Sequence, residues 1–163
     1  MDTSELEAAY RSVLDLAAGS PGPGPPAAGD DQAWGPDDVL AHLIVNDRLL
    51  IRAVRSVLED AARPYDNADA VELAELRALG AELGGPAGLV GALETSSQEL
   101  LDLAGRLDEA QAATPVAIRI LDGDELRLDQ PLPVAALLDI QARRHLPMHE
   151  AQLGELLWRP WLP

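Results

Sequence analysis

The sequence predicts an all-α protein: a four-helix bundle with a short additional helix and a small β-hairpin before the last helix. Apolar residues make up 47% of the 163 residues, yet aromatic residues make up only 3%, and phenylalanine is absent. The core must therefore consist of Leu, Ala, Val and Ile, of which Leu and Ala favour helices. Long segments also repeat apolar residues at the spacing of a helix with one buried face. This length suits one domain, which we expect to span residues 1–163.

The first predicted helix begins at Thr3 and Ser4 and ends at Gly19. Thr3 and Ser4 are residue types favoured at the N-cap, and two glutamates follow in the first turn. Apolar residues recur at helical spacing through this segment: Leu6, Tyr10, Val13, Leu14 and Ala17. The proline- and glycine-rich segment 19–33 is predicted to be a flexible loop.

The second predicted helix begins at Pro36, because a proline followed by two aspartates suits a first helical turn. It is expected to reach about Ala62, just before Arg63 and Pro64. A shorter amphipathic segment at 69–83 ends at two glycines. The third long helix is predicted over residues 86–112.

Between residues 114 and 128 the apolar residues alternate instead of following a helical period, which predicts a β-hairpin that turns at 122–124. The last helix is then expected to run from after Pro133 to about Leu157. Pro147 lies inside it. Buried apolar positions continue on both sides of this proline, so we favour a kinked helix over a broken one.

The charge and residue content exclude several classes of protein. The formal net charge is −16, and all 12 basic residues are arginine, so the surface should repel nucleic acid and anionic membrane. No apolar run is long enough for a membrane span, and the N-terminus lacks the layout of a signal peptide, so we expect a cytoplasmic protein. Cysteine is absent, which excludes a thiolate ligand or nucleophile from this chain.

The three histidines of the chain, His42, His145 and His149, predict a metal site. His145 and His149 stand four residues apart in the last helix, on its buried face, and His42 lies on the inner side of the second helix. Bundles build metal sites from facing helices, and three imidazoles leave a coordination position free on a divalent ion. Zinc is the first expectation, with nickel, copper or iron as alternatives. The competing interpretation is that all three are structural histidines with satisfied hydrogen bonds.

Three amides lie one or two turns from the histidines: Asn46, Gln141 and Gln152. They are candidates to orient the imidazoles or a molecule bound at the site. Alternatively, each is a polar residue satisfied by backbone or water.

Two motifs carry a family resemblance. The segment WGPDDVLAHL at 34–43 resembles the first metal-ligand helix of the DinB-like superfamily, which includes the metal-binding domain of mycothiol-dependent maleylpyruvate isomerase. The segment HLPMHEAQL at 145–153 is similar to the last helix of that superfamily, where an HxxxH pair is followed by Gln-Leu or Gln-Ile. The resemblance covers nearly the whole chain in the order of its helices. The isomerase pattern has glutamate at the position of His145, so this chain resembles the all-histidine branch; the isomerase also carries a second domain.

The resemblance implies a divalent metal with exchangeable water that binds or activates a low-molecular-weight thiol such as mycothiol or bacillithiol. We therefore expect a metal-dependent S-transferase or isomerase acting on a small-molecule substrate or thiol. The alternative is a non-catalytic helical module that binds metal or a ligand, or assembles as a homodimer, which Trp158 and Trp161 favour because tryptophans are enriched at interfaces. A third hypothesis is a degenerate family member without metal.

Overall fold

The computed structural model describes residues 1–19, 33–122 and 125–157. The chain is mostly helical and has a small three-stranded sheet. Its helices are α1 (Ser4–Ala18), α2 (Pro36–Leu58), α3 (Leu73–Glu82), α4 (Pro86–Gly105), α5 (Glu109–Ala112), α6 (Val134–Ile140) and α7 (Leu146–Leu157), with the 3₁₀ turn η1 (Ala68–Val71) and the π-helical turn η2 (Gln141–His145). The strands are β1 (Tyr65–Asp66), β2 (Pro115–Asp122) and β3 (Glu125–Pro133).

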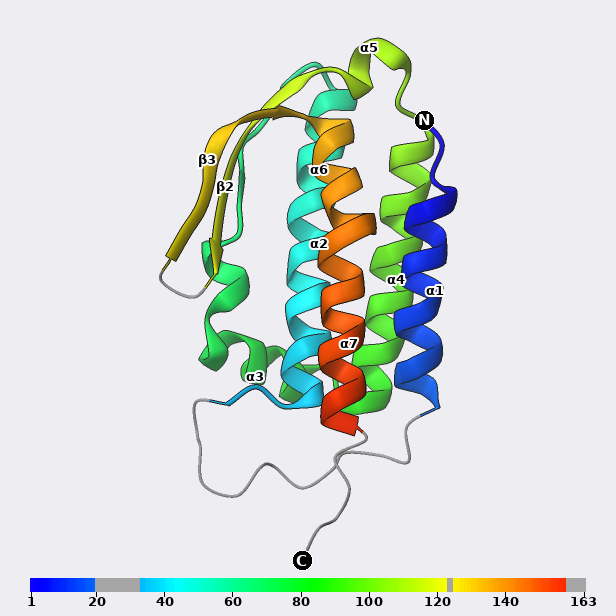
Figure 1. Ribbon diagram of the computed structural model, residues 1–163, viewed down its shortest axis with the longest axis vertical. Coiled ribbons are helices and arrows are strands. Elements are labelled where there is room, and N and C mark those ends of the chain that lie inside the picture. Colours follow the sequence, from blue (N-terminus) through cyan, green and yellow to red (C-terminus); the bar gives the residue numbers. More distant parts are fainter. Residues whose placement is uncertain (20–32, 123–124, 158–163) are drawn as a thin grey trace, which may run out of the picture.

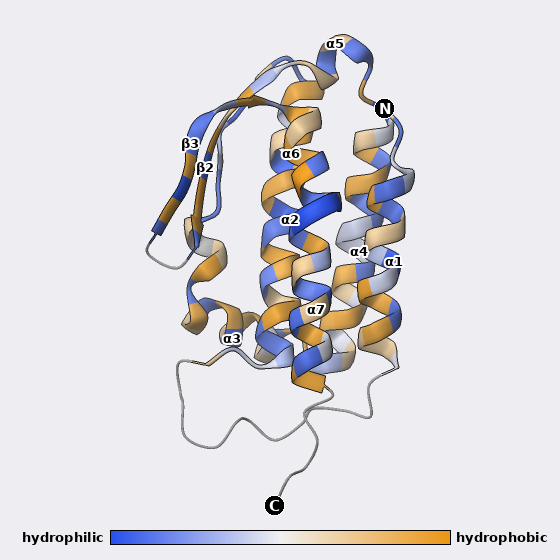
Figure 2. Ribbon diagram, viewed as in Figure 1, coloured by the Kyte–Doolittle hydropathy of each residue, from blue (hydrophilic) through white to orange (hydrophobic). Residues whose placement is uncertain are grey.

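Four helical segments lie side by side along the long axis of the molecule: α1, α2, α4 and the continuous run α6–η2–α7 (Figure 1). Apolar stripes follow these helices (Figure 2) and meet in one core. Each segment contributes side chains that are almost wholly buried, such as Tyr10, Leu50, Leu93 and Leu153. The hairpin β2–β3 stands beside α2 and α6 (Figure 1). In the described part of the chain, no helix is long and apolar enough to cross a membrane.

The extent of the first helix is confirmed, and Thr3 stands at its N-cap as predicted. The Thr3 side chain makes no capping hydrogen bond. Instead, Asp2 Oδ1 accepts a hydrogen bond from the Ser4 N–H at 2.9 Å. Residues 20–32, which contain most of the predicted loop, lie outside the described residues, as do Trp158 and Trp161.

Two helices end earlier than predicted. α2 stops at Leu58, because Asp60 adopts a left-handed φ of 53° and the Ala61 N–H closes back on the Ser56 carbonyl at 2.8 Å. α4 stops at Gly105, and the side chain of Asp108 then caps the separate helix α5 by accepting from the Gln111 N–H at 2.8 Å.

The predicted hairpin is confirmed and extends five residues beyond its expected end at residue 128, to Pro133. β2 and β3 pair antiparallel, with Val116 opposite Leu132. The short strand β1, which pairs parallel to β2 with Tyr65 opposite Ile118, was not predicted. Two residues are too few to show an alternating pattern.

The last helical run continues past Pro147, as predicted. The backbone stays helical through Leu146, at φ −61° and ψ −47°, and α7 follows directly. Just before the proline, the turn widens: the Leu146 N–H bonds to the Gln141 carbonyl, five residues back. This π-helical turn accommodates a residue that has no N–H to donate. It also ends at His145 and so places that imidazole one turn before His149.

Candidate metal centre

The structure brings the three histidines together. His42 comes from α2, His145 from η2 and His149 from α7, and one nitrogen of each lies within 4.8 Å of the others. The ring centroid of His149 is 4.6 Å from that of His42 and 4.6 Å from that of His145. His42 and His149 are buried, and His145 is half-buried. The predicted convergence is confirmed, and the three nitrogens are close enough to share one ion.

Helix starts and apolar neighbours fix these positions. The Gly35 N–H donates to Asp38 Oδ2 at 2.8 Å, which sets where α2 begins. The register then buries Val39 and Leu43, both 0% exposed, on either side of His42. Leu146 and Leu153 anchor α7 in the same way around His149.

The site favours neutral imidazoles. Burial, and to a smaller extent the neighbouring His149, lowers the pKa of His42 to about 4. Burial, with the other two imidazoles nearby, holds the pKa of His145 well below its ordinary value. Burial also lowers the pKa of His149, although its hydrogen bond to Gln152 opposes this. All three rings are therefore neutral at neutral pH, the form that binds metal.

Carbonyl oxygens orient two of the three rings. His42 Nδ1 donates to the Ala70 carbonyl in η1 at 2.7 Å. His149 Nδ1 donates to Gln152 Oε1 at 2.8 Å. In both rings the hydrogen on Nδ1 leaves a lone pair on Nε2, which is the usual arrangement of a metal-bound histidine and its outer partner.

The three amides that were predicted to orient the imidazoles differ in whether they contact a histidine. Gln152 contacts His149 directly, and Asn46 Nδ2 lies 3.5 Å from His145 Nδ1. Gln141 has no hydrogen bond to a histidine; its Oε1 accepts from Asn46 Nδ2 at 2.9 Å. Asn46 and Gln141 are buried.

Sequence reasoning missed two groups that line the site. Trp34 packs with its ring centroid 5.1 Å from that of His42 and lies nearly parallel to His149, at 6.4 Å and 8°. Its position in the 34–43 motif was the available signal. The Ala70 carbonyl had none, because a backbone acceptor has no sequence signature.

Sequence reasoning also missed a buried acid, Asp47, which is 0% exposed. It accepts hydrogen bonds from the Tyr10 hydroxyl, from the Ser96 hydroxyl at 2.7 Å and from Gln141 Nε2 at 3.4 Å. Burial raises the pKa of Asp47 to about 7, although the hydroxyl hydrogen bonds oppose the shift. Its helical position, three residues before buried Leu50, was a usable signal.

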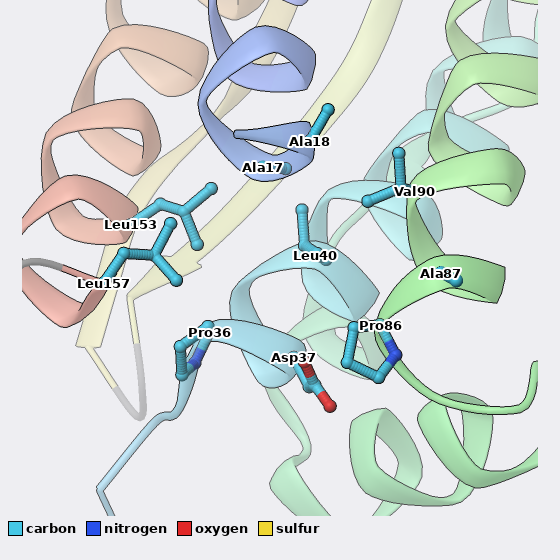
Figure 3. Close-up of a pocket in the computed structure, with 10 residues that line it drawn as sticks. All are labelled: Ala17, Ala18, Pro36, Asp37, Leu40, Pro86, Ala87, Val90, Leu153 and Leu157. Atoms are coloured by element: carbon cyan, nitrogen blue, oxygen red, sulfur yellow. The ribbon is translucent and has the colours of Figure 1, made fainter. Parts of the chain in front are cut away.

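A cavity of about 390 Å³ lies at the end of the helices, apart from the histidines. Leu40, Leu153 and Leu157 point into it, and the Asp37 carboxylate stands at its edge (Figure 3). Its walls are otherwise apolar, and none of its lining residues belongs to the histidine cluster: Ala17, Ala18, Pro36, Asp37, Leu40, Pro86, Ala87, Val90, Leu153 and Leu157.

Comparison with known proteins gives no relative: no family model, no curated protein and no solved structure matches this chain. The chemistry of the site therefore has to be argued from its own geometry.

Proposed function

We propose that His42, His145 and His149 hold a divalent metal ion in a DinB-like four-helix bundle, and that the protein is a metal-dependent thiol S-transferase or isomerase. The observation that supports this most directly is the convergence of three neutral imidazoles within 4.8 Å. The position of the ligands on the second and last long helices is also what the family resemblance implies.

The donor set fits such an ion. His42 and His149 already direct Nε2 lone pairs away from their carbonyl partners, and burial disfavours the protonated form that would repel a cation. Three histidines with an open fourth position form a typical catalytic zinc site. Zinc is our first assignment, with nickel or iron as alternatives.

The surrounding residues would hold the ligands and limit access of water. Gln152 and the Ala70 carbonyl fix two rings, and Trp34 covers His42 and His149 with its indole. A bound divalent ion would supply the positive charge that lowers the pKa of a coordinated thiol. That thiol has to come from a small molecule, since the chain contains no cysteine. The net charge of −16 favours a neutral or weakly charged co-substrate over an anionic one, and disfavours nucleic acid and anionic membranes as partners in the cytoplasm.

Elemental analysis of protein purified without a histidine tag tests the metal centre. We expect about one divalent ion per chain, and its loss in His145→Ala and His149→Ala. Met148→Ala is the matched control, because Met148 lies between these histidines in sequence but is 57% exposed. Full metal retention in both histidine variants would overturn the metal assignment.

A cobalt-substituted sample tests the thiol assignment separately. A bound thiolate should give a new charge-transfer band with mycothiol or bacillithiol, and this chain has no cysteine to produce one itself. If cobalt-loaded protein gave no such band with cellular thiols, the thiol assignment would be contradicted, whereas the assignment of the metal site would stand.

The second candidate function is a non-catalytic binding module. The observation that favours it is the apolar cavity of about 390 Å³, which is separate from the histidines and large enough for a small ligand. A protein that binds metal and thiol but turns over no electrophile would support this candidate, and sedimentation velocity would show whether the module is a homodimer.

A further inference from the structure

Gln141 is a buried amide whose side chain is hydrogen-bonded at both ends. It is the first residue of the π-helical turn η2 and is 3% exposed. Its Nε2 donates to the Tyr10 hydroxyl at 3.2 Å and to Asp47 Oδ1 at 3.4 Å. Its Oε1 accepts from Asn46 Nδ2 at 2.9 Å. The side chain is therefore linked to two consecutive residues of α2 and to one residue of α1.

The backbone of the same residue closes the π-helical turn. The Leu146 N–H donates to the Gln141 carbonyl, five residues back, and His145 is the last residue of the turn. Gln141 thus connects the turn that carries His145 to α2, the helix that carries His42. Single π-helical turns within α-helices are rare and are found frequently at functional sites.

The position of His145 depends strongly on its backbone. His42 Nδ1 and His149 Nδ1 each have a carbonyl oxygen outside the cluster, at 2.7 and 2.8 Å. The contact of His145 Nδ1 with Asn46 Nδ2 is 3.5 Å long, at the limit for a hydrogen bond. His145 Nε2 faces His42 Nε2 at 2.9 Å, inside the cluster, so this contact attaches neither ring to the surrounding fold. The contacts that fix η2 against α2 therefore also fix this imidazole.

The amide of Gln141 favours one position of η2 on α2. A buried amide is costly unless it is hydrogen-bonded, and an apolar side chain of the same size would avoid that cost. A shift of η2 by one residue would move the side chain about 1.5 Å along the helix axis and about 100° around it. The hydrogen bonds to Asp47 and Asn46 would then break inside the core, where unpaired polar groups are most costly.

We propose that Gln141 is a positioning residue for the proposed metal centre: its amide links η2 to α2 and so holds His145 at the distance from His42 that one shared ion requires. This inference rests on the function proposed above. It gives Gln141 a role that acts through the backbone of η2, in place of the contact with an imidazole that the sequence suggested.

Asp47 connects this link to the rest of the bundle. Besides the amide of Gln141, it accepts hydrogen bonds from the Tyr10 hydroxyl of α1 and, at 2.7 Å, from the Ser96 hydroxyl of α4. All four side chains are buried. The hydrogen bonds around Gln141 therefore join η2 to three other long helices, α1, α2 and α4.

Gln141→Met tests the link, because methionine has a similar length and shape but no amide. Zinc affinity should fall about 10-fold or more, as is common when a residue that supports a metal ligand is replaced. The d–d bands of cobalt-loaded protein should shift, because they report the arrangement of the ligands. Val54→Ala is the control for lost stability, since Val54 is 0% exposed and lies about two turns beyond Asn46 in α2. It should lower the free energy of unfolding and leave zinc affinity and the cobalt bands unchanged.

Tyr10→Phe is a milder second variant, which decides the matter if Gln141→Met does not fold. It removes one acceptor of Gln141 Nε2 and keeps the other, Asp47 Oδ1. Zinc affinity should therefore fall less than in Gln141→Met, and the cobalt bands should shift in the same direction.

The outcomes separate this inference from the function on which it rests. Unchanged zinc affinity and unchanged cobalt bands in every one of these two variants that folds would overturn this inference alone, even if the variants are less stable. Wild-type protein that binds no zinc would overturn the proposed metal centre and this inference with it.

Discussion

Single residues in the core of this protein have ionisation properties that set its pH response. Asp47 accepts hydrogen bonds from α1, α4 and η2 but has no basic partner among the described residues that contact it. The pKa of its carboxyl is raised to about 7, mainly by burial. The histidines are shifted the opposite way, so the acid and the three bases all favour their neutral forms.

Asp47→Asn should remove a pH-dependent loss of stability. The carboxyl has a pKa of about 3.9 when unfolded and about 7 when folded, so the folded state binds the proton more tightly. The neutral carboxyl of Asp47 contributes its full stabilisation of the fold below the unfolded pKa of about 3.9. This contribution is lost as the pH rises to the folded pKa of about 7. In urea unfolding of metal-free protein, the free energy of unfolding of the variant should therefore increase relative to that of the wild type over this pH interval, by at most about 4 kcal/mol. If the stability of the variant and that of the wild type changed with pH in parallel, the pKa of Asp47 would be the same in the folded and unfolded states.

Metal affinity should hold to lower pH than ordinary histidines allow. An exposed imidazole is protonated near 6.5, but the pKa of His42 is lowered to about 4, and those of His145 and His149 are also lowered. Protons should therefore begin to compete with zinc only well below pH 6.5, and competition titrations should give nearly constant affinity from pH 8 to about 6. A fall in zinc affinity centred near pH 6.5 would indicate that the histidines are exposed to water and have ordinary pKa values. In the metal-free protein the same shifts lower stability as pH falls below 6.5, because the unfolded chain takes up the protons.

At the scale of secondary structure, the run α6–η2–α7 combines a proline, a π-helical turn and two of the three proposed metal ligands. Pro147 cannot donate to the Arg143 carbonyl, and its ring would clash with that carbonyl in a regular helix. The wide turn at η2, in which Leu146 bonds to Gln141, relieves this conflict immediately before His145 and His149. We infer that the proline maintains the turn that aims His145.

Pro147→Ala should stabilise the helix and weaken the site. Alanine restores an N–H and a regular helical path, which should add about 1 kcal/mol or more to the stability of the metal-free protein. Zinc affinity should fall several-fold, since His145 would be rotated relative to His149. Paired urea and zinc titrations check both effects, with Ala151→Gly as a control for altered helix propensity in α7. Higher stability with unchanged affinity would show that the turn does not position the imidazole.

The sequence could predict the long helices and the convergence of the histidines because helical periodicity fixes which residues share a face. It could not predict where α4 ends, since Leu107 continues the apolar pattern beyond Gly105 and is buried without being helical. Trp34 and the Ala70 carbonyl lie in a loop and a 3₁₀ turn, where no period relates position to direction. Asp47 was missed because aspartate is rarely buried without a cation.

At the scale of the whole molecule, the proposed metal centre joins parts of the chain that are far apart in sequence. His42 lies in α2, and the other two histidines lie about a hundred residues later, in the run that ends the described chain. An ion bound there would crosslink two of the four long helical segments, while α1 and α4 pack against the same core.

Zinc should therefore raise the stability of the whole fold. Binding to the native state alone adds about 2.7 kcal/mol when free metal is 100-fold above its dissociation constant. The unfolding midpoint should rise with zinc in wild-type protein and stay constant in His145→Ala. An equal rise in both proteins would mean that zinc binds elsewhere, for example to the many surface carboxylates.

The indole of Trp34 gives the site an optical reporter. Its ring centroid lies 6.4 Å from that of His149, and the two rings are nearly parallel. An ion held by the histidines would therefore lie close to a fluorophore. Cobalt or copper at that distance should quench its emission, whereas zinc, with a filled d shell, should shift it only slightly. The chain has three tryptophans, so Trp34→Phe identifies how much of the quenching comes from this one. Emission in wild-type protein should then follow occupancy of the site during a titration, without a label and at micromolar protein.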